Sequence, residues 1–254
     1  GRAFQPGHRV LFSLPMYHVY GYVEGLLSVL FVGGSVVPQL SFDPQLTLGG
    51  IERHRADDVL LIPVMTLAVL DAGRQGTYDL SSLTSVISSG GQSPAGIWDD
   101  IFEVLKAEEV TTGYGMSETT GSTTVTRPDD PRDRLLTTNG RLRDVGIAGD
   151  PELGHRLAVY KVVDPESGQD LPAGSVGELL VRGPGVTPGY YDKPEETAAA
   201  FTEDGWLRTG DLGTLDADDY LTLVGRNKDV YRCGGEQVVP KQVEDVLTTH
   251  RSVS

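Results

Sequence analysis

The feature that most constrains the fold is a repeating order of apolar runs and helical patterns in the first half of the chain. From about Val10 to Tyr114, short and almost continuously hydrophobic stretches alternate with stretches of helical periodicity. Strands covered by helices on both faces have this continuous apolar character. We therefore predict βαβ units with a mostly parallel sheet and flanking helices. The runs are Gly25 to Phe31, Ser35 to Pro38, Val59 to Pro63, Val64 to Asp71, Ser85 to Ser88 and Ile97 to Lys106.

The pattern changes after about Gly146, where brief β-rich runs separated by turns replace the helical stretches. This change predicts a small antiparallel barrel or a distorted sheet. The preceding stretch, Arg127 to Arg143, is polar and rich in turn formers, so we expect an exposed loop there. Pro240 suits the first turn of a further helix, Lys241 to Leu247. The β-rich runs are His155 to Asp164, Gly177 to Arg182, Trp206 to Leu212 and Tyr220 to Val224.

These patterns predict an α/β protein with a layered, mostly parallel sheet, a small β-rich part and the start of another domain. An α/β part of a large domain covers residues 1–125, and a barrel-like subdomain of the same domain covers residues 126–225. A hinge over residues 226–229 leads to the start of a truncated C-terminal α+β domain over residues 230–254. Because the sequence opens on Gly1 and closes within a helical pattern, we expect both ends to be cut from a longer polypeptide.

Composition excludes several classes of protein. A formal net charge of −15 repels phosphate backbones and anionic lipid, so polynucleotide binding is not expected. The sequence contains no apolar stretch long enough to span a bilayer and no opening signal peptide. The single cysteine, Cys233, cannot form an internal disulfide and has no nearby His and Cys partners for a metal site. These features predict a globular protein of the reducing cytoplasm.

The segment Thr112-Gly113-Tyr114-Gly115-Met116-Ser117-Glu118-Thr119-Thr120 carries the most chemical information. Glycines allow a backbone to approach a flat ligand closely, and an exposed aromatic ring stacks on a base. A hydroxyl group beside a carboxylate suits phosphate oxygens and Mg²⁺. The functional interpretation is a nucleotide site. The structural alternative is a glycine-rich strand end with a core Tyr and a helix cap at Ser117.

Three later segments add polar groups to this pattern. The segment from Gly205 to Leu212 places Asp211 in a tight turn, where its carboxylate can accept hydrogen bonds from a ribose diol. A strip of basic and acidic residues follows from Gly225 to Val230, and then a glycine loop precedes the helix that begins at Pro240. The structural alternative for the last two segments is a surface hairpin before a helix.

Taken in order, these segments resemble the core motifs of the adenylate-forming family, which includes acyl-CoA synthetases, firefly-type luciferases and peptide-synthetase adenylation domains. The resemblance extends over nearly the whole chain. It implies an acid:CoA ligase that uses ATP and Mg²⁺ to convert a carboxylic acid to acyl-AMP and then transfers the acyl group to CoA. The motifs are Leu14 to Gly21, Ser89-Gly90-Gly91, Tyr114 to Thr119, Gly177 to Tyr191, Arg208 to Asp211 and Gly225 to Asp229.

The resemblance implies a role for individual residues of the nucleotide site. Tyr114 would stack on adenine, and Gly90, Gly91 and Gln92 would form the opposite wall. The family usually has Ala at the position of Gln92. The remaining ligands would be Ser117 at the α-phosphate, Glu118 at Mg²⁺, and Asp211 with Arg226 at the ribose hydroxyls; Ser117, Glu118 and Arg226 are the expected catalytic residues.

The resemblance also implies an acyl pocket, a hinge and a thiol channel. His18, Gly115 and Met116 would line the acyl pocket, with Tyr20 nearby. Lys228 would be the hinge about which a small domain rotates between the two half-reactions. Gly234, Gly235 and Glu236 would approach the pantetheine arm of CoA. Cys233 receives no catalytic role, because the nucleophile of the family is the incoming thiol.

Two parts of the family's machinery are absent from these 254 residues. The phosphate loop with its lysine would precede Leu14, and the catalytic lysine of the C-terminal domain would follow Ser254. We therefore expect these residues alone to bind AMP but to make little adenylate. Two main alternatives stay open: an acyl-AMP ligase that loads a carrier-protein thiol, and a non-catalytic nucleotide-binding fragment. The motifs do not exclude luciferase-type oxygenation either. An amino-acid adenylation domain is disfavoured, because Tyr17-His18 replaces the Phe-Asp pair that grips the substrate ammonium.

Overall fold

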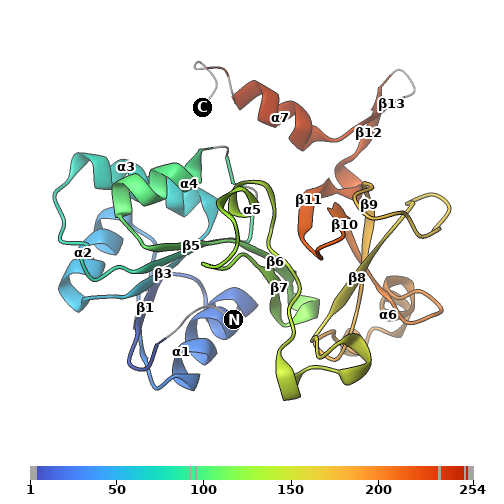
Figure 1. The fold of residues 1–254 in the computed structure, drawn as a ribbon, viewed down its shortest axis with the longest axis horizontal. Coiled ribbons are helices and arrows are strands. Elements are labelled where there is room, and N and C mark those ends of the chain that lie inside the picture. Colours follow the sequence, from blue (N-terminus) through green and yellow to red (C-terminus); the bar gives the residue numbers. More distant parts are fainter. Residues whose placement is uncertain (1–4, 92, 95, 234–235, 249, 251–254) are drawn as a thin grey trace. The chain divides into compact units, whose positions relative to one another are not determined.

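The computed structural model describes residues 5–91, 93–94, 96–233, 236–248 and 250 (Figure 1). The chain forms two compact units, Gly1–Leu136 (unit 1) and Thr137–Ser254 (unit 2). The hinge and the three-part division at residues 125 and 225 remain predictions. No helix in the described part of the chain is long and apolar enough to cross a bilayer.

The centre of unit 1 is a five-stranded sheet in the order β2-β1-β3-β4-β5 (Figure 1). Every neighbouring pair in it is parallel, so the predicted mostly parallel sheet is confirmed. The strands are β1 (Arg9–Phe12), β2 (Ser35–Pro38), β3 (Asp58–Leu61), β4 (Ser85–Ser88) and β5 (Glu109–Thr111).

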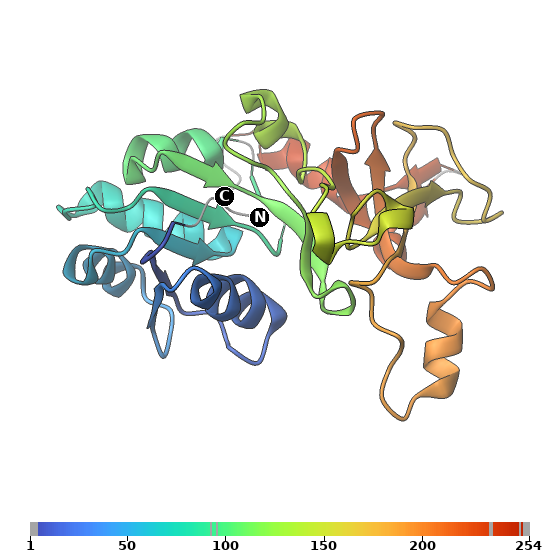
Figure 2. The ribbon, with the colours of Figure 1, turned by 60° about the horizontal axis from the view of Figure 1, so that its bottom comes forward.

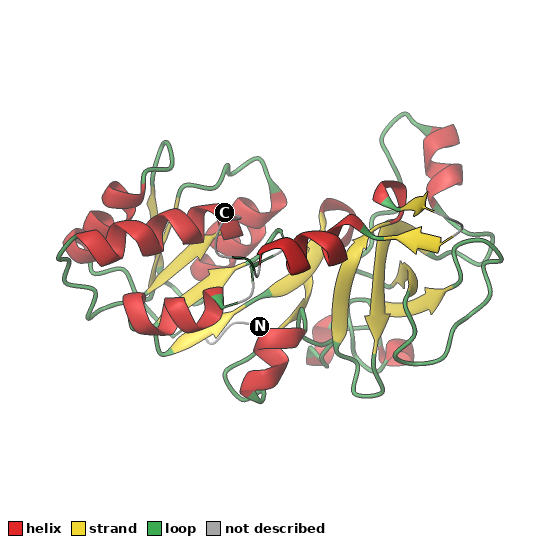
Figure 3. Ribbon diagram, turned by 90° about the horizontal axis from the view of Figure 1, so that it is seen from above, coloured by secondary structure: helices red, strands yellow, loops and turns green. Residues whose placement is uncertain are grey.

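Helices cover both faces of this sheet, as its continuous apolar strands require (Figure 3). Alternate strand residues point to opposite faces, so Leu11 and Val59 pack in one core and Val10 and Leu60 in the other. The first core includes residues of α2 (Pro44–His54), α3 (Pro63–Gln75), α4 (Ile97–Asp100) and the π-helix η2 (Ile101–Leu105). The second includes residues of the π-helix η1 (Tyr20–Leu27) and α1 (Ser28–Phe31).

Helix α2 is a real element that the sequence patterns did not predict. The Asp43 carboxylate accepts a hydrogen bond from the Leu46 N–H at 2.8 Å, and Pro44 occupies the first turn. Leu48 and Ile51 are fully buried. Gly49 and Gly50 in the middle of the helix lower its intrinsic propensity, so tertiary burial rather than propensity determines it.

An antiparallel hairpin follows the parallel sheet. Its strands are β6 (Gly113–Met116) and β7 (Gly121–Val125), with the 3-10 turn η3 (Ser117–Thr119) between them. A Cβ at Gly115 would lie 1.8 Å from the Gly121 carbonyl oxygen, so only glycine permits this approach. The most informative sequence segment therefore forms one edge and the tip of a hairpin.

The prediction of an exposed loop from Arg127 to Arg143 was wrong in part. Helix α5 (Arg132–Thr137) forms within it, and Leu135 packs in the core of unit 1. In unit 2, Leu142 is also buried, and the Asn139 side-chain oxygen accepts a hydrogen bond from Leu223 N–H at 2.8 Å. One pair of leucines and one further leucine in a charged stretch give no periodic pattern, which is why the sequence did not reveal these anchors.

The main sheet of unit 2 is four-stranded and antiparallel, in the order β11-β10-β9-β8. It confirms the predicted change from helical to β-rich structure. Short 3-10 turns precede and follow it, and α6 projects from it between long loops (Figure 2). These elements are β8 (Val159–Val163), β9 (Gly177–Arg182), β10 (Leu207–Leu215), β11 (Leu221–Arg226), α6 (Pro194–Ala200), η4 (Gly146–Ala148), η5 (Pro151–Leu153) and η6 (Asn227–Asp229).

The end of the described chain contains a second hairpin and a helix. Strands β12 (Tyr231–Cys233) and β13 (Glu236–Val238) pair antiparallel. Helix α7 (Pro240–Thr248) begins at the proline that was predicted to open it. The predicted helix is confirmed.

Candidate functional site

In unit 1, the predicted nucleotide residues lie where the parallel strands end. Gly90 and Gly91 follow β4, and the Ser89 hydroxyl donates a hydrogen bond to the Gly113 carbonyl at 2.8 Å, which ties this loop to the start of β6. Gly90 has a φ of +81°, a value that favours glycine. The carboxyl edge of a parallel sheet is the usual place for a ligand in α/β folds.

The ring of Tyr20 packs under the Gly90 loop. A Cβ at Gly90 would lie 3.6 Å from the Tyr20 ring, and the Tyr20 hydroxyl donates to the Leu61 carbonyl at 3.0 Å. Tyr114 lies on the neighbouring hairpin and is also buried, with 6% of its surface exposed. A base that stacks on Tyr114 must therefore reach the ring at its exposed edge or displace a neighbouring side chain.

The tip of the hairpin presents the predicted phosphate and magnesium ligands. Ser117 is exposed, Glu118 is half-buried and Thr119 is buried. The Thr119 hydroxyl accepts from Met116 N–H at 3.1 Å, and the Gly121 carbonyl lies 3.2 Å from the same oxygen. Thr119 therefore closes the turn from inside, whereas Ser117 is exposed and Glu118 is half-buried.

The predicted acyl-pocket residues come from two elements of unit 1. Gly115 and Met116 end β6, and His18 precedes the π-helix η1. The His18 Nδ1 atom accepts a hydrogen bond from Tyr20 N–H at 3.1 Å, which orients the exposed imidazole at the start of η1. Gly121 stands directly opposite Met116 in the hairpin, and a Cβ placed on Gly121 would lie within 4 Å of Glu24 and Val23 in η1. The structure therefore places η1 against the end of the hairpin.

In unit 2, the predicted ribose ligands are neighbours across the ladder. Asp211 on β10 stands opposite Arg226 on β11, and Arg226 Nε lies 3.4 Å from Asp211 Oδ1. Asp211 is buried, whereas the Arg226 side chain is 62% exposed. A buried carboxylate with an exposed guanidinium can offer both an acceptor and a donor to a diol.

The other predicted residues of unit 2 follow β11. Lys228 is exposed in the middle of η6, and its neighbours in η6 are exposed too. A rotation of the backbone at this position would therefore disturb few packing contacts. Glu236 begins β13 opposite Cys233. Gly234 and Gly235 lie outside the described residues, as does Gln92 in unit 1.

Among the described residues, no group of three or more His, Cys, Asp or Glu side chains is arranged to hold a metal ion. A divalent cation can also bind through one protein carboxylate together with ligand oxygens and water. Mg²⁺ commonly binds proteins in this way, through one or two carboxylates plus substrate phosphates. The single carboxylate at the hairpin tip, Glu118, fits that mode.

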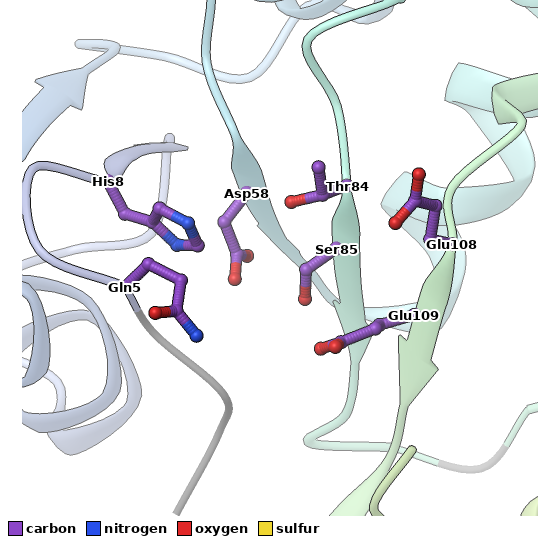
Figure 4. A pocket seen from close by; sticks show the side chains of 7 residues that line it. All are labelled: Gln5, His8, Asp58, Thr84, Ser85, Glu108 and Glu109. Atoms are coloured by element: carbon purple, nitrogen blue, oxygen red, sulfur yellow. The ribbon is translucent and has the colours of Figure 1, made fainter.

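A polar pocket of about 170 Å³ lies at the opposite, amino edge of the parallel sheet (Figure 4). Asp58, Ser85 and Glu109 stand side by side in register at the starts of β3, β4 and β5. None of the predicted site residues lines this pocket. The remaining lining residues are Gln5, His8, Thr84 and Glu108.

Sequence reasoning missed two residues that organise the site. Ser89 was quoted only as part of a motif, although its hydroxyl joins two strand-end loops. Glu24 on η1 carried no signal at all, yet its carboxylate accepts a hydrogen bond from Ser122 N–H at 3.0 Å. The 98-residue separation of that pair explains why no local pattern could reveal it.

The chain matches a known protein family and is similar in sequence to several known enzymes. A family model described as AMP-binding enzyme matches residues 1–191. The chain is 35% identical over 94% of its length to an (octahydroindenyl)propanoyl:CoA ligase of Mycobacterium tuberculosis, of which it covers 43%. It is 36% identical over 96% of its length to the pyochelin synthase PchD of Pseudomonas aeruginosa, of which it covers 42%.

A solved structure of ATP-bound MatB has a similar fold. ATP-bound MatB from Rhodopseudomonas palustris superposes with a TM-score of 0.84 at 29% identity, covering 97% of this chain and 46% of that protein. The predicted α/β fold with added antiparallel sheets is thereby confirmed. The chain spans about two fifths of the length of the relatives that it matches.

Proposed function

Because the chain belongs to the AMP-binding enzyme family, we propose that it forms part of an ATP-dependent acid:CoA ligase. The proposed reaction has two steps. The substrate carboxylate attacks the α-phosphorus of ATP and releases pyrophosphate, and a thiol then displaces AMP from the acyl-adenylate. The observation that carries the proposal is the hairpin tip at the carboxyl edge of the sheet, where exposed Ser117 stands beside Glu118.

In the first step, unit 1 positions the triphosphate. The Ser117 hydroxyl contacts the α-phosphate, and Glu118 holds Mg²⁺, which supplies positive charge to the phosphates. The backbone at Gly90 and Gly91 and the exposed edge of Tyr114 receive the adenine. Catalysis in phosphoryl and nucleotidyl transfer is largely positioning and electrostatic stabilisation, which is the chemistry that such a site can provide.

Unit 2 holds the ribose and serves the second step. Asp211 accepts hydrogen bonds from the ribose hydroxyls, and Arg226 donates to them. Exposed Lys228 is the proposed hinge between the two half-reactions, and Gly234 to Glu236 approach the pantetheine arm. The acid binds beside His18, Gly115 and Met116, which favours a largely apolar acyl group.

A carrier-protein thiol is the alternative acceptor. One of the similar proteins is named a synthase rather than a CoA ligase, which supports this alternative. Consumption of free CoA during acid-dependent AMP release separates the two acceptors. A non-catalytic nucleotide-binding role is the remaining alternative. Cys233 is an exposed free thiol, which favours a reducing, cytoplasmic location.

The test is acid-dependent exchange of labelled pyrophosphate into ATP by the natural protein that contains this chain. The intact mass of this protein is measured first. If the mass is above 27.3 kDa, pyrophosphate exchange tests the proposed activity. If the mass equals 27.3 kDa, AMP binding is the appropriate test of the site. Glu118→Gln is expected to lower kcat/KM about 100-fold, the loss typical of one group that stabilises transition-state charge.

The matched control is Glu103→Gln, which removes an exposed carboxylate of η2 that is none of the predicted site residues. It should leave exchange unchanged. A wild-type protein with the larger mass that shows no exchange with any of a broad panel of carboxylic acids would contradict the proposed ligase.

A further inference from the structure

One long-range hydrogen bond joins the π-helix η1 to the hairpin that carries Ser117 and Glu118. The Glu24 Oε1 atom accepts from Ser122 N–H at 3.0 Å. The same oxygen would lie 3.3 Å from a Cβ placed on Gly121, so the carboxylate covers the last residue of the turn. Ser122 and Gly121 are the ladder partners of Gly115 and Met116, so Glu24 lies opposite the strand end that leads into Ser117.

The turn that Glu24 touches has an unfavourable backbone. Thr120 has a φ of +63° and Gly121 a φ of +101°, so two consecutive residues are left-handed. Thr120 is β-branched, and such a side chain rarely adopts this conformation. A strained conformation of this kind persists only when its surroundings determine it, and it is concentrated at functional sites.

Contacts from within the hairpin and from outside it support this turn. Within the hairpin, the Thr119 hydroxyl bonds to the Met116 backbone. From outside the hairpin, Glu24 fixes the residue that follows the two left-handed positions. Glu24 makes this single hydrogen bond and no ion pair among the described residues, so its carboxylate is not committed to another structural role.

The helix that carries Glu24 is itself unusual. Residues Tyr20–Leu27 form eight residues of π-helix, although π-helices are rare and occur mostly as single turns, often at functional sites. Ser28, directly after it, returns its hydroxyl to the Val23 carbonyl at 2.6 Å. A Cβ placed on Gly121 would also lie within 4 Å of Val23 in the helix and of Val19 directly before it, so these side chains pack against the turn.

We propose that Glu24 is a positioning residue, which holds the strained turn so that Ser117 and Glu118 meet the α-phosphate and the metal ion. This inference rests on the proposed function. Glu24 acts through the Ser122 N–H and contacts neither ligand. Groups that orient a metal ligand in this way typically change activity 10- to 100-fold when they are removed.

The test compares two replacements of Glu24 in the natural protein that contains this chain. Glu24→Gln keeps an oxygen acceptor at the same length, whereas Glu24→Met keeps the length and removes the acceptor. We expect Glu24→Met to lower kcat of pyrophosphate exchange about 10- to 100-fold and to raise the Mg²⁺ concentration needed for half-maximal rate. KM for the acid should change far less than kcat, and Glu24→Gln should retain most of the activity.

Asp43→Ala is the matched control, because Asp43 also uses its carboxylate to accept from a backbone N–H in unit 1, but at the start of α2. It should leave kcat and the Mg²⁺ dependence unchanged. Amide hydrogen exchange provides an independent measurement. In Glu24→Met, exchange should accelerate at Ser122 and at the turn from Ser117 to Gly121, and in Asp43→Ala it should accelerate only near α2.

Relief of the backbone strain gives the sharpest check. Asn adopts left-handed angles far more readily than Thr, so Thr120→Asn should restore part of the lost kcat when it is combined with Glu24→Met. The double variant also serves if Glu24→Met alone fails to fold. Unchanged kcat in Glu24→Met, or an equal loss in Glu24→Gln, would overturn the inference while leaving the proposed function intact. An inactive wild type would overturn the proposed function instead.

Discussion

The parallel sheet of unit 1 and the antiparallel sheet of unit 2 present their predicted functional residues in different ways. In unit 1 these residues lie on loops and on the β6–β7 hairpin beyond the ends of the parallel strands, and side-chain hydrogen bonds from Ser89 and Glu24 hold those segments. In unit 2, Asp211 and Arg226 are part of the ladder itself and face each other across β10 and β11.

This difference follows from how the two sheets bury their faces. Both faces of the parallel sheet are covered by helices, so a ligand can reach only its edges, and the residues there need separate anchors. Neighbouring strands of an antiparallel sheet carry paired side chains directly, so backbone register alone brings two functional groups together. Loss of one side chain should therefore disturb geometry in unit 1 more than in unit 2.

The largest expected effect tests whether the two units have independent cores. Leu11 in β1 and Leu179 in β9 are fully buried, so Leu11→Ala and Leu179→Ala should each lower the free energy of unfolding by about 2–5 kcal/mol. The chain has two tryptophans, and Trp98 reports on unit 1 and Trp206 on unit 2. Single-Trp variants followed in urea should show each substitution shifting only the transition of its own unit. A common shift at both reporters would show one cooperative core instead.

A smaller effect is expected at the ladder pair of unit 2. Asp211→Asn should weaken AMP binding about tenfold or more, because a hydrogen bond to a charged group is worth about 1.5–3 kcal/mol. Calorimetric titration with AMP measures the loss, and circular dichroism should show an intact sheet.

The matched control is Glu178→Gln, since Glu178 is a buried carboxylate of the same sheet paired with Arg208 at 3.1 Å. It should lower stability and leave AMP affinity unchanged. Equal loss of AMP affinity in both variants would mean that the ladder, rather than the Asp211 carboxylate, governs binding.

The smallest effects are expected at two carboxylates, one in each unit, that accept hydrogen bonds from nearby serines. The Ser81 hydroxyl and N–H, with Arg55 nearby, lower the pKa of Asp79, and the N–H and hydroxyl of Ser167 lower the pKa of Asp164. A lowered pKa in the folded state stabilises the protein above the ordinary carboxyl pKa, and this contribution disappears as pH falls through the folded value.

Asp79→Asn and Asp164→Asn should therefore slightly destabilise unit 1 and unit 2 at neutral pH and match the wild type in acid. Added salt should reduce the effect at Asp79, which pairs with Arg55 at 2.8 Å, more than the effect at Asp164, whose pKa is lowered by uncharged donors. Thermal unfolding at several pH values and salt concentrations measures both. A destabilisation that persists in acid would show that the pKa shifts are not its cause.

Periodicity predicted the parts of the fold that repeat. The strands β4 and β9 were predicted with the bounds that the structure has, because each is a short apolar run between clear turn signals. Helix α2 was missed, because Gly49 and Gly50 interrupt its pattern and burial of Leu48 and Ile51 stabilises it. The Arg127–Arg143 stretch was misjudged for a related reason, since only two of its residues, Leu135 and Leu142, are buried apolar anchors.

The sequence by itself determined the order of elements, the change from a parallel to an antiparallel sheet and the family motifs, because these depend on residues close together along the chain. Tertiary structure alone decided that Glu24 reaches Ser122 and that Tyr114 is largely buried. The physical reason is that hydrogen bonds and burial depend on distance in space. Glu24 and Ser122 are 98 positions apart, so no local sequence pattern includes both and predicts their contact.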